Sequence, residues 1–415
     1  MSEFEYTAFP EKSSALEDLK RKIKTKDPNL AIFFLTPSLI DYFKDFSRIV
    51  KCDSITVPVE GFVTRTGVWT RGGLVWLIDE KVEVEKYFGG ADEVCRKLKA
   101  SKSGKFSLLI YPTVYLGSRA SALATLLKEK RYYNLYKKGQ KFVLAKVAKL
   151  LRDKVLYPIN DTLRPFRDRE ETTISLNLFP LEFKWNSPIL AYNGEKIGRG
   201  LLRIKFSNLK SLNYTDTFPE RGNTFEENLE ILKMETGYAK PVEFESEDVA
   251  IGYVDGKTLV EFAFGNRAFK AENFVGEVNK GDFMGATPQG LWMFSKKGGL
   301  AFLGIFDIGT NIYPSLYNTN YFENSGVFTL SEVNRYLIPE ICSFLDDHFD
   351  VAFLDQNYLL IYERNVVELK DCMKESFGIF VLSPAASFKP KRNYFTEIED
   401  GIFSSLTRNI VSIKI

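Results

Sequence analysis

Histidine is almost absent from this chain, because His348 is the only one among 415 residues. A Ser-His-Asp or Cys-His catalytic site could use only that residue, and a metal site with several histidine ligands is excluded. His348 follows Asp346 and Asp347 near the end of a predicted helix, where it could act as a general base or a pH sensor. The favoured alternative is a helix-end histidine that carbonyl groups and nearby acids satisfy. The sequence therefore favours a binding protein over an enzyme, and it indicates no cofactor and no metal.

Cysteine is also scarce, and no two of the four cysteines form a CxxC pair. This spacing predicts four unpaired thiols in a cytoplasmic protein. The first residues are acidic and lack the apolar core of a secretory signal. No apolar run reaches the roughly 18 residues that a membrane span needs. Few His, Cys and Met beside abundant Lys and Glu are typical of a heat-adapted source.

The common nucleotide and hydrolase motifs are missing. No GxxxxGK[ST] phosphate-binding loop and no GxSxG nucleophile turn occurs. The Gly198-Arg199-Gly200 segment lacks the third glycine of a dinucleotide fingerprint, and it leads into a predicted strand rather than a helix. These absences remove the main enzyme classes that a sequence motif could identify.

What the chain has in abundance is apolar and aromatic residues, with 45% hydrophobic residues and 14% aromatic ones. Leu30–Leu35 and Phe106–Tyr111 are continuous apolar runs, which is typical of strands that are buried on both faces. Amphipathic helices alternate with such strands. The pattern predicts an α/β to α+β fold of two mixed-sheet halves with flanking helices. The polar segment Leu209–Asn223 places the boundary between an N-terminal α/β domain (1–210) and a strand-rich C-terminal α+β domain (211–415).

Charge is balanced overall, with 56 Lys and Arg against 54 Asp and Glu, but it is unevenly distributed. Lys128–Lys154 has ten basic and two acidic residues, a local charge of +8. Two interpretations stay open. Lys138, Lys141 and Lys149 could contact an anionic partner such as a nucleic acid, an acidic protein or a membrane surface. Alternatively the segment is the solvated face of a helix whose apolar stripe packs on a sheet, as its spacing also predicts. The stripe comprises Leu144, Val147, Ala148, Leu151 and Val155.

Two polar loops at predicted strand ends are candidate ligand sites. In Glu60–Gly67, the candidate residues are Glu60, Arg65 and Thr66, because a guanidinium can bind a carboxylate through two hydrogen bonds. The alternative is a plain surface hairpin.

The second loop, Ser383–Ser387, follows a predicted strand, and Tyr394–Ile398 comes shortly after it. Ser383, Ser387 and Glu397 could bind an amine-bearing small molecule. The alternative is ordinary turn chemistry around the nearby prolines. For the acidic run Glu243–Asp248, a solvated strand edge is favoured over a metal site.

The order of these elements resembles the FIST sensory domain family, with both its N-terminal and C-terminal parts. The N-terminal resemblance lies in a helix, a hydrophobic strand and a strand–turn–strand unit around Glu60-Gly61. The C-terminal resemblance lies in a strand–Asp-Gly–strand unit over Val249–Phe264 and in a late strand that runs into a Ser-containing turn. The Gly-Cys-Ser-like turn of the family is Val59–Phe62 here, and the glycine of its "GEI" segment is Thr396. The remaining matching segments are Ser13–Ile23, Leu30–Leu35, Phe106–Tyr111, Thr173–Phe206, Phe380–Ser383, Tyr394–Ile398 and Ile410–Ile415.

The resemblance implies a cytoplasmic sensory protein that binds a small ligand, for example an amino acid or a related metabolite. No output domain is apparent in the sequence, so a separate signalling partner protein would pass the signal on. The alternative function is a non-enzymatic interaction or scaffold protein that meets an anionic partner through residues 128–154.

Overall fold

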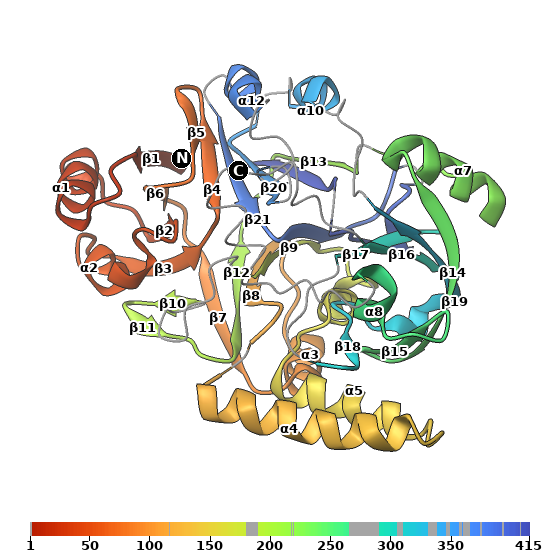
Figure 1. The fold of residues 1–415 in the computed structure, drawn as a ribbon. Helices are drawn as coiled ribbons and strands as arrows, with labels where there is room; N and C mark the ends of the chain where they lie inside the picture. Colours follow the sequence, from red (N-terminus) through yellow and green to blue (C-terminus); the bar gives the residue numbers. More distant parts are fainter. Residues whose placement is uncertain are drawn as a thin grey trace.

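The predicted fold class is confirmed, because the computed structural model combines several mixed sheets with helices that cover them (Figure 1). No described helix has both the length and the apolar composition that crossing a bilayer would require. The structure describes residues 2–115, 117–179, 190–216, 218, 220–264, 290–304, 310–330, 338–345, 349–356, 359, 366–373, 376–391, 394–406 and 408–415.

The first sheet is built from the N-terminal part of the chain. Its strands in spatial order are β1 (Ser2–Thr7), β6 (Gly73–Ile78), β2 (Leu30–Leu35), β3 (Asp53–Pro58), β10 (Ala191–Tyr192) and β11 (Glu195–Lys196). The pair β2–β3 is parallel. Helices α1 (Lys12–Ile23) and α2 (Phe43–Ser47) cover one face, where Phe33 of β2 packs against Phe46. The opposite face points into the protein interior.

The second sheet lies at the centre of the molecule. Its order is β23 (Glu397–Glu399), β24 (Ile402–Phe403), β22 (Ser383–Ser387), β9 (Thr172–Leu178), β8 (Phe106–Pro112), β12 (Gly200–Phe206) and β7 (Glu83–Phe88). Helices α3 (Ala91–Ala100) and α6 (Ile159–Leu163) pack on one of its faces. Helix α5 (Val143–Lys154) packs against α3, and α4 (Arg119–Tyr136) lies outside α5 (Figure 1).

The third sheet joins the two ends of the chain. Its order is β13 (Ser211–Thr215), β25 (Ile410–Lys414), β20 (Val351–Asp355), β21 (Phe377–Val381), β4 (Gly61–Thr64) and β5 (Gly67–Trp69). The second and third sheets thus combine strands from both sides of residue 210, as β9–β22 and β4–β21 show. Whether the ranges 1–210 and 211–415 fold independently stays a prediction.

Helices α10 (Ile338–Phe344) and α12 (Val366–Cys372) cover the third sheet, and a disulfide between Cys342 and Cys372 connects them. The prediction of four unpaired thiols was wrong for these two cysteines. Their Cα atoms lie 5.1 Å apart because two helices separated in sequence pack side by side, which spacing alone does not indicate. Cys52 and Cys95 are free thiols, and burial raises the pKa of Cys95 to about 12.

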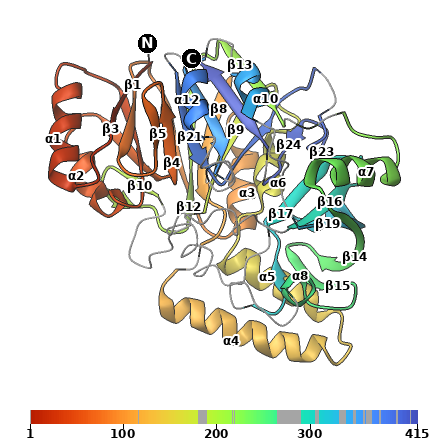
Figure 2. The ribbon, with the colours of Figure 1, turned by 45° about the horizontal axis from the view of Figure 1, so that its top comes forward.

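The fourth sheet forms a separate layer with its own helices (Figure 2). Its order is β17 (Leu300–Gly304), β16 (Gly290–Ser295), β19 (Phe322–Thr329), β14 (Ala239–Glu247), β15 (Ala250–Val254) and β18 (Tyr313–Pro314). Helix α7 (Phe225–Thr236) packs on β14, and α8 (Leu259–Phe264) packs on β15. The expected strand after Asp255-Gly256 is therefore a helix. Glu261 and Thr258 cap it with hydrogen bonds of 3.2 and 3.3 Å, and such a cap overrides the strand propensity of the aromatic residues.

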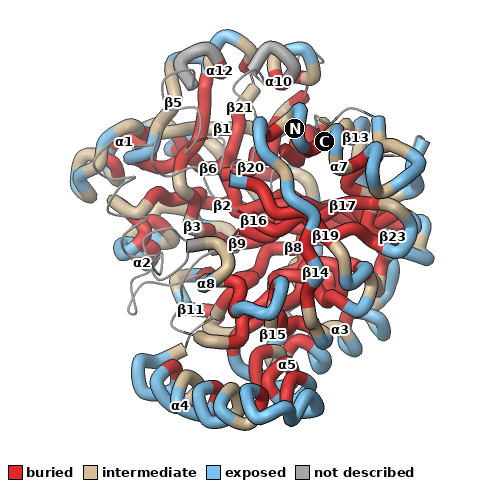
Figure 3. Tube along the Cα trace, turned by 45° about the vertical axis from the view of Figure 1, so that its right-hand side comes forward, coloured by how far each residue is buried: buried red, intermediate tan, exposed pale blue. Residues whose placement is uncertain are grey.

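One apolar core lies between the first three sheets, and Figure 3 shows it as a continuous buried interior. Alternate residues of β8 face opposite ways, so Leu108 packs in this core while Leu109 packs against the helices on the other face. Both side chains are fully buried. This double burial confirms the interpretation of the continuous apolar runs.

Candidate functional site

The structure separates the residues of the first predicted loop. Glu60 is half-buried between β3 and β4, whereas Arg65 and Thr66 form the exposed turn between β4 and β5. The Thr66 hydroxyl lies 2.6 Å from the Tyr6 hydroxyl and 2.9 Å from that of Thr64. Because strand β4 runs between them, Glu60 and Arg65 are at opposite ends of one strand and do not form a single ligand-binding loop.

The second predicted loop is a buried strand, β22, rather than a turn. Ser383 pairs with Asn177 at one end of β9, and Ser387 pairs with Thr173 at the other end. Glu397 begins β23, where its carboxylate accepts a 3.1 Å hydrogen bond from the Gly401 amide and burial raises its pKa. The predicted residues therefore lie in three places, and β-sheet register rather than loop proximity determines which of them meet.

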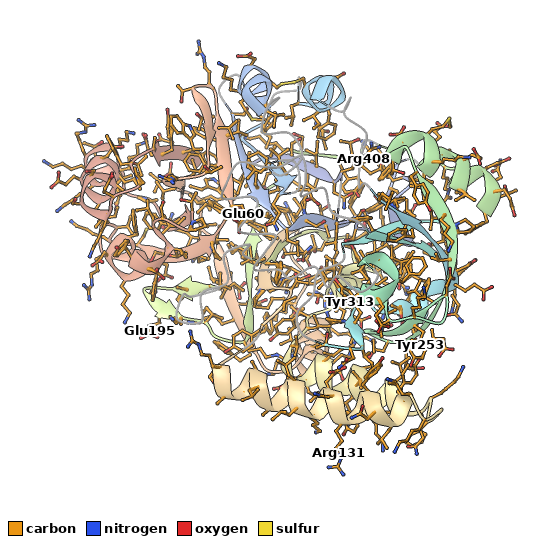
Figure 4. All side chains as sticks on the ribbon, in the orientation of Figure 1. Glu60, Arg131, Glu195, Tyr253, Tyr313 and Arg408 are labelled. Carbon is orange, nitrogen blue, oxygen red and sulfur yellow. A yellow bond between two sulfur atoms is a disulfide. The ribbon has the colours of Figure 1, made fainter. Side chains whose placement is uncertain are left out.

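Register brings one predicted pair of residues to the same region. In the antiparallel pair β4–β21, Gly61 lies opposite Phe380, so Glu60 lies beside the end of β21. That strand leads directly into Ser383. Figure 4 places Glu60 at the centre of the molecule, where the first and third sheets meet.

The carboxyl ends of parallel strands converge at this region. The parallel pairs are β8–β9 and β20–β21. Gln356, which follows β20, donates its amide to the Val381 carbonyl at 2.6 Å and its side-chain amide to Phe179 at 3.4 Å. The Leu382 amide donates to the Asn177 carbonyl at 3.1 Å. In sheets with parallel strands, ligands commonly bind just outside these ends.

We define the strand-end cluster as the buried polar side chains at and around this convergence. Asn177 donates its side-chain amide to the Ser383 carbonyl at 2.7 Å, and it accepts a 3.0 Å hydrogen bond from Ser175. The Ser383 hydroxyl donates to the Ser405 carbonyl. The strand-end cluster comprises Tyr111, Asn177, Tyr317, Asp355, Gln356 and Ser383, and each is at most 3% exposed.

The cluster has one carboxylate beside two phenols. Burial, with a contribution from the negative charge of Asp355, raises the pKa of Tyr317, which accepts a 3.3 Å hydrogen bond from Ser404. Burial likewise raises the pKa of Tyr111, so both phenols are neutral hydrogen-bond donors. Among the described residues, the Tyr111 hydroxyl makes no hydrogen bond of ordinary geometry, although the hydroxyls of Ser175 and Thr162 lie near enough to oppose the rise of its pKa. Buried polar groups are almost always partnered, so this hydroxyl has unused capacity to bind a ligand or a water.

Sequence reasoning missed most of this cluster. A usable signal exists for Asp355, because an acid directly follows the apolar run Val351–Leu354. Tyr317 lies outside the strands and helices, and no local pattern points to it. His348 lies outside the described residues.

A second polar group, the ion-pair cluster, joins α5 and α6 to the fourth sheet and to β23. Arg152 contacts Asp161 at 2.6 Å, Asp248 at 2.9 Å and Asp92 at 2.5 Å. Arg164 contacts Asp161 at 2.6 Å and Glu399 at 2.6 Å. The ion-pair cluster comprises Asp92, Arg152, Asp161, Arg164, Asp248 and Glu399.

Asp248 is the carboxylate of the ion-pair cluster that is least well compensated. Burial raises its pKa to about 6; the charge of Arg152 opposes this increase, and the neighbouring charge of Asp161 adds to it. Asp161 also accepts a 3.0 Å hydrogen bond from Asn318. The two carboxylates compete for one guanidinium, and Asp161 is the closer.

The basic segment 128–154 is divided between two helices. The apolar stripe of α5 is buried, and the helix packs on β14 and β15 of the fourth sheet, as docking of the stripe on a sheet predicted. Lys138, Lys141 and Lys149 are exposed, and Lys141 makes a 3.0 Å ion pair with Glu245. Among the described residues, no group of acids or thiols has metal-binding geometry. The acidic run Glu243–Asp248 is among these residues. Contact of the three lysines with an anionic partner stays a prediction.

Two comparisons with known proteins bear on this chain. Residues 226–335 match the model of the AF0772-like protein C-terminal domain, and this range spans most of α7 and the strands of the fourth sheet. An uncharacterized protein of Archaeoglobus fulgidus is 32% identical over 360 residues, which is 86% of this chain and 100% of that protein. The matched domain lies inside the chain here, and β20, β21 and β25 follow it.

Proposed function

This chain belongs to the AF0772-like protein family, and we propose that it binds a small amine-bearing ligand at the strand-end cluster. One observation carries the proposal: a fully buried carboxylate, Asp355, ends β20 at the carboxyl ends of the parallel strands β20 and β21. A ligand ammonium group can form an ion pair with a buried carboxylate. An amino acid or a related metabolite has that group.

The other members of the cluster suit the remaining atoms of an amino acid. The Tyr111 hydroxyl can donate to a ligand carboxylate, because no atom of the described residues accepts its hydrogen bond. The amide groups of Asn177 and Gln356 offer further donors and acceptors. Neutral donors and one carboxylate at the same place match a zwitterion better than they match a purely anionic ligand.

A sensory role is part of this proposal and rests on the order of elements shared with FIST sensory domains. In that role the protein is cytoplasmic, and ligand binding changes its contact with a separate signalling partner. The helix at 259–264, where the family-like layout has a strand, is a departure from that layout. The proposed ligand class does not depend on that segment.

A thermal-shift screen against amino acids and metabolite amines tests the proposal. A ligand at 100 times its dissociation constant stabilises the folded state by about 2.7 kcal/mol. We expect Asp355→Asn to abolish this stabilisation, because it removes the charge that binds the ammonium group. Glu397→Gln is the matched control, since it neutralises a partly buried carboxylate on β23.

The proposal fails if no amine in the panel stabilises the protein, or if the stabilisation persists in Asp355→Asn. Equal loss in Glu397→Gln would also contradict it, because that carboxylate is outside the strand-end cluster. Circular dichroism and the melting temperature without ligand show that each variant is folded.

A further inference from the structure

Helix α4 packs one side on the core and holds a buried charge there, while apolar residues are also exposed on its opposite side. Its inward side includes Glu129, which is 1% exposed and accepts backbone hydrogen bonds from Asn311 at 3.0 Å and from Ile312 at 2.8 Å. Tyr136, seven residues further on, donates to Glu245 at 2.6 Å. These contacts fix the rotation of the helix about its own axis, so a polar group is held inside and the opposite side faces solvent.

The solvent side carries a row of apolar residues. Leu123 and Leu127 are 59% and 61% exposed. With Ala120 and Ala124, which are also exposed, they follow the spacing of one helix face. An apolar row this open has no role in packing the described part of the chain, and such rows mark interaction surfaces.

Exposed charge around the row is of one sign. Between residues 119 and 142 the only acid is Glu129, which is turned inward. Arg131 points away from the body of the protein in Figure 4. The exposed cations are Arg119, Lys128, Lys130, Arg131, Lys137, Lys138 and Lys141.

We propose that α4 docks on the surface of an anionic lipid bilayer, with its leucines entering the headgroup boundary and its cations binding lipid phosphates. The helix has 18 residues and is therefore about 27 Å long. It is the outermost element along one rim of the molecule in Figures 1 and 2, so a flat surface can meet it along its length. Lys128 and Lys130 flank the Leu127 position, as lysines do beside an inserted apolar row.

A second copy of the chain or a nucleic acid would suit the exposed face of α4 less well than a bilayer. A second copy that docked through the same face would bring two cationic helices together, and their charges would repel. A nucleic acid would use the cations through its phosphates but would gain nothing from Leu123 and Leu127. The combination of exposed leucines with neighbouring cations, of which Lys141 also pairs with Glu245, is what selects the bilayer.

Co-sedimentation with vesicles tests the proposal. We expect binding to phosphatidylcholine vesicles that contain phosphatidylglycerol and no binding to phosphatidylcholine alone. The double variant Leu123→Ser/Leu127→Ser should bind roughly tenfold more weakly. Lys130→Gln/Arg131→Gln should lose about fivefold per charge removed, and added salt should weaken binding of the unaltered protein.

Two controls match these variants. Met234→Ser removes an apolar side chain that is 68% exposed on α7, and Lys20→Gln removes an exposed cation on α1; neither should change vesicle binding. The proposal is overturned by absence of binding to both vesicles, by equal binding to both, or by leucine variants that bind as the unaltered protein does. Binding of RNA or DNA that the leucine variants retain, without vesicle binding, would assign the face to nucleic acid instead.

Discussion

The strand-end cluster and the ion-pair cluster are both buried and polar, yet they differ in how many of their polar groups have hydrogen-bond or ion-pair partners. In the ion-pair cluster, Asp161 contacts two arginines and an asparagine, and Arg152 contacts three carboxylates. In the strand-end cluster the Tyr111 hydroxyl has no partner. A saturated polar network holds elements together, whereas one with unused donors can accept a ligand. We therefore assign structure to the first and binding to the second.

The largest expected effect is on the ion-pair cluster. Arg152→Met leaves Asp92, Asp161 and Asp248 without their shared guanidinium, so we expect a loss of roughly 3–5 kcal/mol in the free energy of unfolding. Urea denaturation measures it. Arg48→Met is the control: Arg48 is exposed and pairs with Asp45 at 3.7 Å, away from the cluster, so its loss should cost under about 1 kcal/mol. Similar losses in the free energy of unfolding for both variants would contradict a structural role for the ion-pair cluster.

The next effect is a pH dependence centred on Asp248. Its pKa of about 6 lies above the ordinary aspartate value, so the folded state holds the proton more tightly than the unfolded chain. This group therefore makes stability fall as pH rises from about 4 to about 6, on the order of 2–3 kcal/mol in total. Asp248→Asn should lack that component. Urea denaturation at several pH values measures this component. If the free energy of unfolding changes equally with pH in the unaltered protein and in Asp248→Asn, the assignment to Asp248 is wrong.

A smaller effect separates two tyrosines whose rings pack at 6.0 Å, Tyr111 and Tyr157. Tyr111→Phe removes an unpartnered buried hydroxyl, so the ligand-free protein should be stabilised by up to about 1 kcal/mol while ligand stabilisation weakens. Tyr157→Phe removes a 2.6 Å hydrogen bond to the Gly89 carbonyl and should cost about 1 kcal/mol. Chemical denaturation measures both changes in the free energy of unfolding, and changes of opposite sign would support different roles for the two hydroxyls. Destabilisation by both would show that the Tyr111 hydroxyl is not free for a ligand.

The smallest effect is expected at Arg65. It lies on an exposed turn at the far end of β4 from Glu60, so Arg65→Ala should change stability by less than about 0.5 kcal/mol and leave ligand stabilisation unaltered. The thermal-shift assay that detects the ligand checks this. Loss of the ligand response in this variant would return the site to the sequence-predicted loop.

Much of the fold was predictable because long apolar runs have few alternative structures. Leu30–Leu35 and Phe106–Tyr111 are strands buried on both faces, and the apolar stripe of α5 is buried. Helix 259–264 was not predicted, because its aromatic residues also suit a strand and its capping residues were the weaker signal. The disulfide depends on packing between distant helices, which no local pattern shows.

The candidate site was predictable only in part, because it too depends on packing between segments that are distant in sequence. Glu60 and Ser383 were chosen as strand-end residues, and the register of β4 with β21 does bring them to one region. Arg65 and Ser387 were chosen with them, but each is one strand length away. Asp355 raises the pKa of Tyr317 through its negative charge, although the two residues are distant in sequence. Which distant residues lie near one another depends on the order of strands in a sheet, and the hydrophobic periodicity of the sequence does not determine that order.

The pairing of β4 with β21 has a consequence for how the protein is made. Gly61 and Phe380 are neighbours in the third sheet but are more than 300 residues apart in the chain. At about 5–20 residues per second, a ribosome needs roughly 15–60 s to make the intervening segment. During that interval β4 has no β21 to pair with, and its exposed strand edge is open to wrong partners. A nascent chain arrested before residue 377 should therefore need a chaperone to stay free of aggregation.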